Sequence, residues 1–185
     1  MFSEYKLQTP FKREDLACLK IGDKVLLSGK IYTARDAAHK RLFQLLQEGK
    51  ELPIEIEGQA IYYVGPTPPK PGQVIGSAGP TTSERMDPYT PLLLDRGLKA
   101  MIGKGQRSPA VIEAIKRNGA VYLAATGGAG VLLARAVKSS RVVAYEELGA
   151  EAIRELEVED LPLIVAVDPQ GRDLYQEGVS QYCLP

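Results

Sequence analysis

The sequence predicts an α/β protein with a single domain and a mixed, partly parallel sheet. From residue 88 onwards, short apolar runs rich in β-forming residues alternate with segments of helical periodicity, which is typical of parallel strands joined by helices. A length of 185 residues suits one compact domain, so residues 1–185 are expected to form one unit. Hydrophobic residues make up 44% of the chain and charged residues 25%, which indicates an ordinary globular protein.

The first third of the chain is less regular. Extended residues on either side of Gly29 predict a strand pair within residues 24–32. A helix with one apolar face is expected from about Asp36 to near Gly49. Residues 60–66, AIYYVGP, form a short β-rich run that ends at Gly-Pro. We expect this part to add antiparallel strands to the sheet.

A proline-rich loop follows. Residues 66–73, PTPPKPGQ, contain four prolines, which fit neither a helix nor a central strand, so the segment is predicted to be a stiff connection within the domain. Residues 73–80, QVIGSAGP, are predicted to form a β-strand after this loop. They lead into GSAGPTTSERMDPY, residues 76–89, where small, hydroxylated and charged side chains are unusually dense.

The remaining elements alternate. The expected order is helix 88–96, strand 99–103, helix 108–119, strand 120–126, helix 127–139, strand 141–147 and strand 161–169. Asp87 and Gly97 are suited to begin and end the first of these helices. The second has Ser108 as its N-cap, Pro109 at its first position and Gly119 at its end.

Charge and cysteine content limit the possible functions. Lys+Arg and Asp+Glu balance at 23 each, so no net field favours nucleic acid or acidic lipid. No apolar run is long enough to span a bilayer and the N-terminus lacks a secretory signal, so we expect a cytoplasmic protein. Cys18 and Cys183 lie near opposite ends and are expected to be free thiols. Two cysteines are too few to hold an iron–sulfur cluster.

Four polar clusters follow predicted strands. They are TARDAAHKR at 33–41, TTSER at 81–85, GKGQRS at 103–108 and TGGAG at 126–130. Ligands of open α/β sheets gather outside the carboxyl ends of the strands. The last three clusters also precede or abut predicted helix N-termini, where backbone amides attract anions. The sequence therefore predicts a ligand site at this edge of the sheet.

Each cluster also has a structural interpretation. Thr81 and Glu84 are spaced as a capping box, which alone could explain the hydroxyl groups. TGGAG lacks the spacing of a dinucleotide fingerprint and the lysine of a phosphate loop, so close packing of helix on strand explains its glycines better than nucleotide binding. His39 is the sole histidine, and a lone histidine on a helix is more often structural than catalytic.

Taken together, the clusters favour an anion site. Cations from three strand ends, Arg35, Arg85 and Lys104, would suit a small dicarboxylate, because a guanidinium binds a carboxylate in a planar two-bonded pair. Thr81 would supply a hydroxyl able to donate, accept or shuttle a proton. Glycines at 76, 79, 103 and 105 would let backbone amides approach the ligand. No metal motif or strong acid–base group accompanies them, so the chain offers only half of a catalytic site.

At these residues the chain resembles a known family. GKIYTARDAAHKR, YYVGPTPPKPGQVIGSAGPTTSERMD, MIGKG and TGGAGVLLA, in this order and spacing, resemble the β subunit of class I fumarate hydratase. The C-terminal domain of single-chain class I fumarases and the β subunit of L(+)-tartrate dehydratase share the pattern. The resemblance runs from about Leu19 to Gly178 and implies a swivelling β/β/α domain.

The resemblance implies an iron–sulfur hydro-lyase that interconverts fumarate and (S)-malate, an activity of central metabolism. An α subunit, absent here, would carry a [4Fe-4S] cluster on three cysteines, with one open iron acting as a Lewis acid on the C4 dicarboxylate. An α2β2 hetero-oligomer is expected. The β chain would close over the substrate.

Site residues follow from the same resemblance. Arg35 of TARD and Arg85 of TTSER are expected to grip the substrate carboxylates, and Lys104 of GKG to bind or support the substrate. Thr81 is the expected base, activated by a carboxylate of the partner chain. Two alternatives stay open. One is a tartrate dehydratase β subunit, and the other is a non-catalytic anion-binding module.

Overall fold

The computed structural model describes residues 2–126 and 128–182. Within them a seven-stranded mixed sheet has the order β1-β2-β3-β4-β5-β7-β6. The strands are β1 Glu4–Gln8, β2 Lys24–Thr33, β3 Ala60–Tyr62, β4 Ala100–Gly103, β5 Val121–Ala124, β6 Val137–Ala144 and β7 Ile153–Val167. The α/β fold class with a mixed sheet is therefore confirmed.

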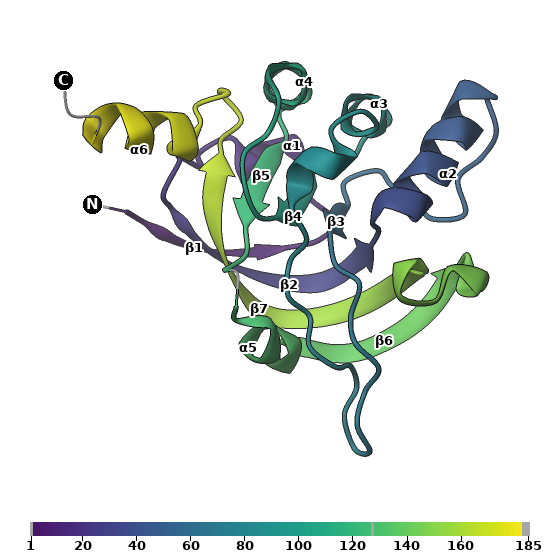
Figure 1. Cartoon of the computed structure of the whole chain (residues 1–185). Coiled ribbons are helices and arrows are strands. Elements are labelled where there is room, and N and C mark those ends of the chain that lie inside the picture. Colours follow the sequence, from purple (N-terminus) through teal and green to yellow (C-terminus); the bar gives the residue numbers. More distant parts are fainter. Residues whose placement is uncertain (1, 127, 183–185) are drawn as a thin grey trace.

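The sheet closes on itself through its longest strand. Neighbours from β1 to β5 pair in parallel, whereas β7 runs antiparallel to β2, β5 and β6. Because β7 contacts both β5 and β2, strands β2, β3, β4, β5 and β7 form a closed five-stranded barrel (Figure 1). Within the first third of the chain β1, β2 and β3 pair in parallel, and the antiparallel pairing expected there is that of β2 with β7 from the last third.

Helices cover the barrel unequally. They are α1 Arg13–Leu16, α2 Asp36–Gln47, η1 Ser83–Met86, α3 Thr90–Asp95, α4 Pro109–Asn118, α5 Gly130–Arg135, η2 Glu146–Glu151 and α6 Leu174–Tyr182. Helices α2, α3 and α4 lie along one side of the barrel, and α5 lies near β6 on the other (Figure 1). None of the helices in residues 2–126 and 128–182 has the length and hydropathy needed to cross a membrane.

Two apolar cores explain why the strands read as continuous hydrophobic runs. Ala60 and Tyr62 of β3 belong to a core that draws residues from all five barrel strands, whereas Ile61 and Tyr63 belong to a second core beneath α2, α3 and α4. Strands buried on both faces are apolar at every position rather than at alternate ones.

Two strand predictions were wrong. Residues 24–33 form one continuous strand, in which Gly29, at φ +99°, accommodates a bulge against β7. Residues 73–80 form no strand. They return along the proline-rich segment, held by hydrogen bonds from the Thr67 amide to the Ser77 carbonyl and from the Gly76 amide to the Thr67 carbonyl, each 3.1 Å long. The result is a long protruding loop (Figure 1).

Other boundaries differ more modestly. Helix α4 has the predicted extent and ends at Gly119, at φ +57°. Helix α3 begins at Thr90 rather than at residue 88, because the Asp87 carboxylate contacts the start of α4 instead. Helix α5 is shorter than the predicted 127–139, whose first residue, Gly127, lies outside the described residues. Strands β1 and the first half of β7, and helices α1 and α6, were not predicted. Cys18 is an exposed free thiol, and Cys183 lies outside the described residues.

Candidate functional site

The first two polar clusters meet where β2 and β3 end. Thr33 at the end of β2 pairs with Tyr62 at the end of β3, so the segment from Ala34 leaves the sheet beside Tyr63. The Thr81 amide donates to the Tyr63 carbonyl at 2.7 Å. The TTSER segment therefore lies beside the residues that extend β3.

The third cluster joins at the end of β4. Thr82 forms a parallel bridge with Lys104, and the Ser83 amide donates to the Lys104 carbonyl at 2.9 Å. The TTSER segment thus runs between the extensions of β3 and β4. This arrangement brings Thr81, which is half-buried, and Lys104, which is exposed, to the same edge of the sheet.

Arg85 links this segment to α2. Its Nε donates to Asp36 Oδ1 at 2.8 Å, and 52% of its side chain is exposed. Asp36 is the first residue of α2, directly after Arg35. The two arginines of the TARD and TTSER motifs are thereby brought to the same corner of the molecule.

Arg35 lies deeper than Arg85. Its Nη2 is 3.6 Å from Glu151 Oε1, while Glu151 Oε2 accepts from the Ala37 amide at 2.8 Å. The guanidinium packs so closely on Gly65 that a Cβ there would collide with Nη1. Only 23% of the Arg35 side chain is exposed. Glu151 therefore steadies both the arginine and the N-terminus of α2.

Three neighbouring polar atoms at this corner are buried without a hydrogen-bond partner in the described part of the chain. They are Arg35 Nε, Asp36 Oδ2 and His39 Nε2. Buried polar groups are nearly always satisfied, by protein, water or ligand. All three atoms belong to residues 35–39, at the N-terminus of α2.

His39 is structural in its contacts. It is fully buried, with Nδ1 at 3.0 Å from the Arg35 carbonyl, so Nδ1 carries the proton and donates it to that oxygen. Its ring meets Tyr63 edge-on at 5.1 Å between centroids. Burial lowers the pKa of His39 to about 4, so the ring is neutral at pH 7.

The capping-box interpretation of the hydroxyl groups is not supported. Helix η1 begins at Ser83 with Thr82 as its N-cap, and no side chain among the described residues caps it. The Thr81 hydroxyl is therefore not used for capping, which leaves it available at the sheet edge.

Two of the four glycines that were expected to approach a ligand are packed closely against their neighbours, and their role toward a ligand stays a prediction. A Cβ at Gly103 would collide with Ser83 Oγ, and one at Gly76 would collide with Thr67. Gly130 lies against the Ser77–Gly79 backbone, where its carbonyl accepts from the Ala78 amide at 3.0 Å. The packing interpretation of TGGAG thus holds at Gly130, with the loop rather than a strand as its neighbour.

Sequence reasoning missed a buried ion pair. Arg107 of GKGQRS is fully buried and donates from Nε to Asp87 Oδ1 at 2.7 Å. Asp87 was expected to cap the helix at 88–96. Nothing in the local pattern distinguishes Arg107 from a solvated loop cation, because its burial depends on Tyr63 and Tyr122 from distant strands.

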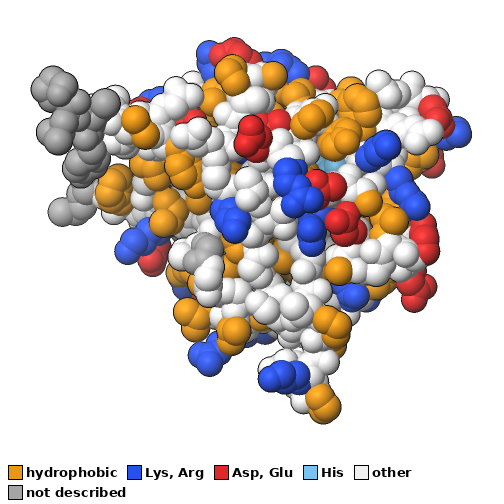
Figure 2. All heavy atoms as spheres, viewed as in Figure 1, with side chains coloured by type: hydrophobic (Ala, Val, Ile, Leu, Met, Phe, Trp, Pro, Cys, Tyr) orange, Lys and Arg blue, Asp and Glu red, His pale blue; other side chains and the backbone are white. Residues whose placement is uncertain are grey.

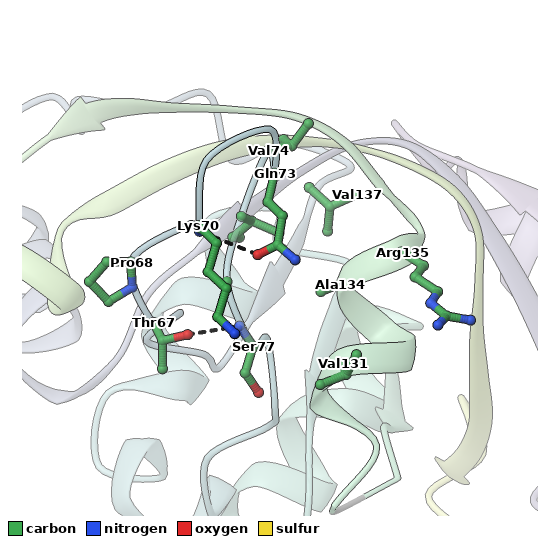
Figure 3. Close-up of a pocket in the computed structure, with 12 residues that line it drawn as sticks. Thr67, Pro68, Lys70, Gln73, Val74, Ser77, Val131, Ala134, Arg135 and Val137 are labelled. Carbon is green, nitrogen blue, oxygen red and sulfur yellow. Dashed lines mark hydrogen bonds between the residues drawn. The ribbon is translucent and has the colours of Figure 1, made fainter.

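The surface beyond this edge is mixed in charge. Figure 2 shows Lys and Arg side chains interspersed with Asp and Glu in the middle of one face, without a large patch of one sign. A groove of about 490 Å³ lies between the proline-rich loop and α5, where Lys70 and Ser77 face Val131 and Ala134 (Figure 3). Its lining does not include Arg35, Thr81, Arg85 or Lys104.

Comparison with known proteins agrees with this arrangement of motifs. The family model described as Fumarase C-terminus matches residues 2–178. The chain belongs to this family. It is 41% identical to the anaerobic class I fumarate hydratase of Escherichia coli, over 96% of this chain and 33% of that protein. It is 42% identical to a putative L(+)-tartrate dehydratase subunit beta of Methanocaldococcus jannaschii, over 89% of this chain and 88% of that protein.

This fumarase C-terminal domain therefore spans about a third of the length of the curated fumarate hydratases that it matches. Fumarate hydratase 2 of Leishmania major, 38% identical, is covered over 30% of its length. The resemblance inferred from the motifs is confirmed. The structure brings Arg35, Thr81, Arg85 and Lys104 to one edge of the sheet, and their roles toward a substrate remain predictions.

Proposed function

We propose that this chain is the β subunit of a fumarate hydratase and supplies the cationic half of a site shared with a cluster-bearing α subunit. The observation that carries the proposal is the meeting of the TARD, TTSER and GKG segments at one sheet edge.

The cations of this edge are suited to a C4 dicarboxylate. Hydration of fumarate develops negative charge on a carboxylate in the transition state, and fixed cations stabilise such charge. Arg35 and Arg85 now contact Glu151 and Asp36. Exposed ion pairs contribute only about 0–1 kcal/mol, so a substrate carboxylate can displace Asp36 from Arg85 at little cost. The pair of Arg35 with Glu151 is half-buried.

Thr81 is the proton-handling group in this proposal. A threonine acts as a strong base only after its hydroxyl has lost its proton, and the hydroxyl is too weak an acid to lose that proton unaided. Thr81 therefore needs an activating neighbour. Lys104 would support the negative charge of the substrate from the adjacent segment. We assign the activating carboxylate to the α subunit.

The iron–sulfur cluster does not fit this chain. Two cysteines, at opposite ends of the sequence, cannot supply three thiolate ligands. In this proposal the cluster belongs to the α subunit. A cytoplasmic α2β2 assembly completes the proposal.

A tartrate dehydratase β subunit is the second candidate. The match to the putative L(+)-tartrate dehydratase subunit beta of Methanocaldococcus jannaschii covers 88% of that subunit. Malate and L-tartrate are both four-carbon hydroxy dicarboxylates, and the same cations would bind either. The rate ratio for the two substrates separates these candidates.

The test is reconstitution with a chain that matches the other two-thirds of the fumarate hydratases. The complex should hydrate fumarate, and Arg85→Ala should lower kcat/KM by roughly 100-fold or more because a transition-state contact is lost. Arg117→Ala is the matched control, since Arg117 forms an exposed pair with Asp95 away from this edge. Its turnover should stay within about twofold of wild type.

Near-normal turnover of Arg85→Ala would remove the proposed role of the arginine. A complex that binds dicarboxylates without turning over fumarate or tartrate would favour the non-catalytic anion-binding module.

A further inference from the structure

A buried polar cluster lies beneath the candidate site. It comprises Tyr63, Ser83, Asp87, Thr90, Arg107 and Tyr122, and we call it the Arg107 cluster. All six residues are buried. Charged side chains are rarely buried in proteins, so a buried arginine directly below a row of motif residues calls for a physical explanation.

Arg107 is the centre of this cluster. Its Nε donates to Asp87 Oδ1 at 2.7 Å and its Nη2 to Thr90 Oγ1 at 2.9 Å. The guanidinium carbon lies 5.3 Å from the Tyr63 ring centroid and 4.9 Å from that of Tyr122. The planar guanidinium is thus hydrogen-bonded through Nε and Nη2 and lies close to two aromatic rings, a set of contacts that a lysine could not reproduce.

The cluster is bonded to the segment that carries Lys104. Ser83 Oγ and Tyr122 Oη are 2.9 Å apart, and Tyr122 Oη donates to the Gly105 carbonyl at 2.9 Å. Asp87 Oδ2 accepts from the Ser108 amide at 2.6 Å. The GKGQRS loop is therefore held at Gly105 and at Ser108, both on the C-terminal side of Lys104.

The same cluster supports the other site segments. The Tyr63 carbonyl accepts the Thr81 amide, and the Tyr63 ring packs against His39, whose Nδ1 donates to the Arg35 carbonyl. The TARD, TTSER and GKG segments, which are distant in sequence, thus share one set of buried contacts.

Stability alone does not explain a buried pair of this kind. Removing two charges from water costs several kcal/mol per ion, and replacing a buried pair by apolar residues of similar volume is often neutral or stabilising. What apolar residues cannot supply is directional bonding that fixes one loop relative to another. Register of the loops is therefore the function that fits the Arg107–Asp87 pair best.

We propose that Arg107 and Asp87 are positioning residues, which hold the loops carrying Thr81 and Lys104 in register without touching substrate. The importance of that register for turnover rests on the proposed function. The register itself is a property of this chain alone and can be measured without a partner or a substrate.

The experiment replaces both charges by apolar residues. In the double variant Asp87→Leu/Arg107→Met the chain should fold, with a Tm close to that of wild type. Amide hydrogen exchange is then measured by NMR at Thr81 and Ser83, whose acceptors, the Tyr63 and Lys104 carbonyls, are unaltered. Both amides should exchange at least tenfold faster than in wild type, while the distant Thr9 amide, bonded to Ser28, should not change.

The matched control is Asp95→Leu/Arg117→Met. This pair has two hydrogen bonds, of 2.8 and 2.7 Å, but it lies on the surface. Exchange at Thr81 and Ser83 should be unaffected there. Exchange within twofold of wild type in the folded Asp87→Leu/Arg107→Met chain would overturn the proposal.

Two further measurements keep the test decisive. If the double variant does not fold, the same measurement is made on Arg107→Lys, which retains the charge but not the planar guanidinium. Exchange at the same two amides should be faster than in wild type. Unchanged exchange in that variant would overturn the proposal. In the reconstituted complex, the folded double variant should lower kcat/KM at least tenfold. Two results together separate the positioning role from the proposed function. If the amides exchange faster in the double variant but the wild-type complex has no turnover, the proposed function is refuted and the positioning role stands.

Discussion

Single residues at the sheet edge are held by charged side chains of other segments. Arg85 contacts Asp36, and Arg35 contacts Glu151. Both arginines could be predicted as candidate site residues, because TARD and TTSER are local sequence patterns. They did not predict Glu151, which reaches Arg35 from a segment more than a hundred positions away. Partners of this kind depend on the tertiary fold, and a single sequence carries no local signal for them.

His39 makes the stability of the chain depend on pH. Its pKa is lowered to about 4 by burial, against 6.5 for an ordinary histidine. The unfolded chain therefore binds a proton as the pH falls through 6.5, whereas the folded chain does not until about pH 4. Stability is complete above pH 6.5 and should fall by about 2 kcal/mol between pH 7.5 and pH 5 through this group alone.

Urea unfolding at the two pH values measures this contribution. Carboxylates also titrate near pH 5, so the comparison is with His39→Asn, which can still donate to the Arg35 carbonyl but does not titrate. The variant should lose about 2 kcal/mol less than wild type over the same interval. Equal losses in the two proteins would show that His39 is not the group responsible.

At the scale of elements, the predictions that succeeded were those with local chemical markers. Pro109 and Gly119 fixed the limits of α4, and the prolines of residues 66–73 identified the loop. Val74 and Ile75 suggested a strand, but they pair with no strand among residues 2–126 and 128–182. Strand β1, EYKLQ, was missed because exposed polar residues alternate with half-buried ones and no apolar run results.

The junction between η1 and β4 should not tolerate a larger residue. In Gly103→Ala the new methyl group would collide with Ser83 Oγ and lie 3.0 Å from Tyr63 Cδ2. Overpacking of this kind costs about 1–3 kcal/mol in the free energy of unfolding. Thermal or urea unfolding of the variant chain measures the loss.

Gly178→Ala is the control for that substitution. Gly178 lies inside α6, with no atom within 4 Å of an added Cβ, so alanine should stabilise the helix by up to about 1 kcal/mol. If Gly103→Ala is as stable as wild type, the close packing between the TTSER segment and β4 is incorrect.

At the scale of the molecule, the closed barrel is the feature that could not be predicted from the sequence. Alternation of strands and helices predicted a mixed sheet, but closure depends on β7 pairing with β2, which is far away in the chain. Predicting the ends of parallel strands was nevertheless sufficient to place the candidate site, because those ends share one edge in an open or closed sheet. The buried Arg107 cluster, by contrast, exists only once distant strands are packed together.

The most direct test of the central claim is a crystal structure of the reconstituted complex with malate bound. We expect the two malate carboxylates to contact Arg35 and Arg85, with Thr81 and Lys104 beside the same molecule and the metal cluster on the other chain. Malate bound in the complex without contact to either arginine would contradict it.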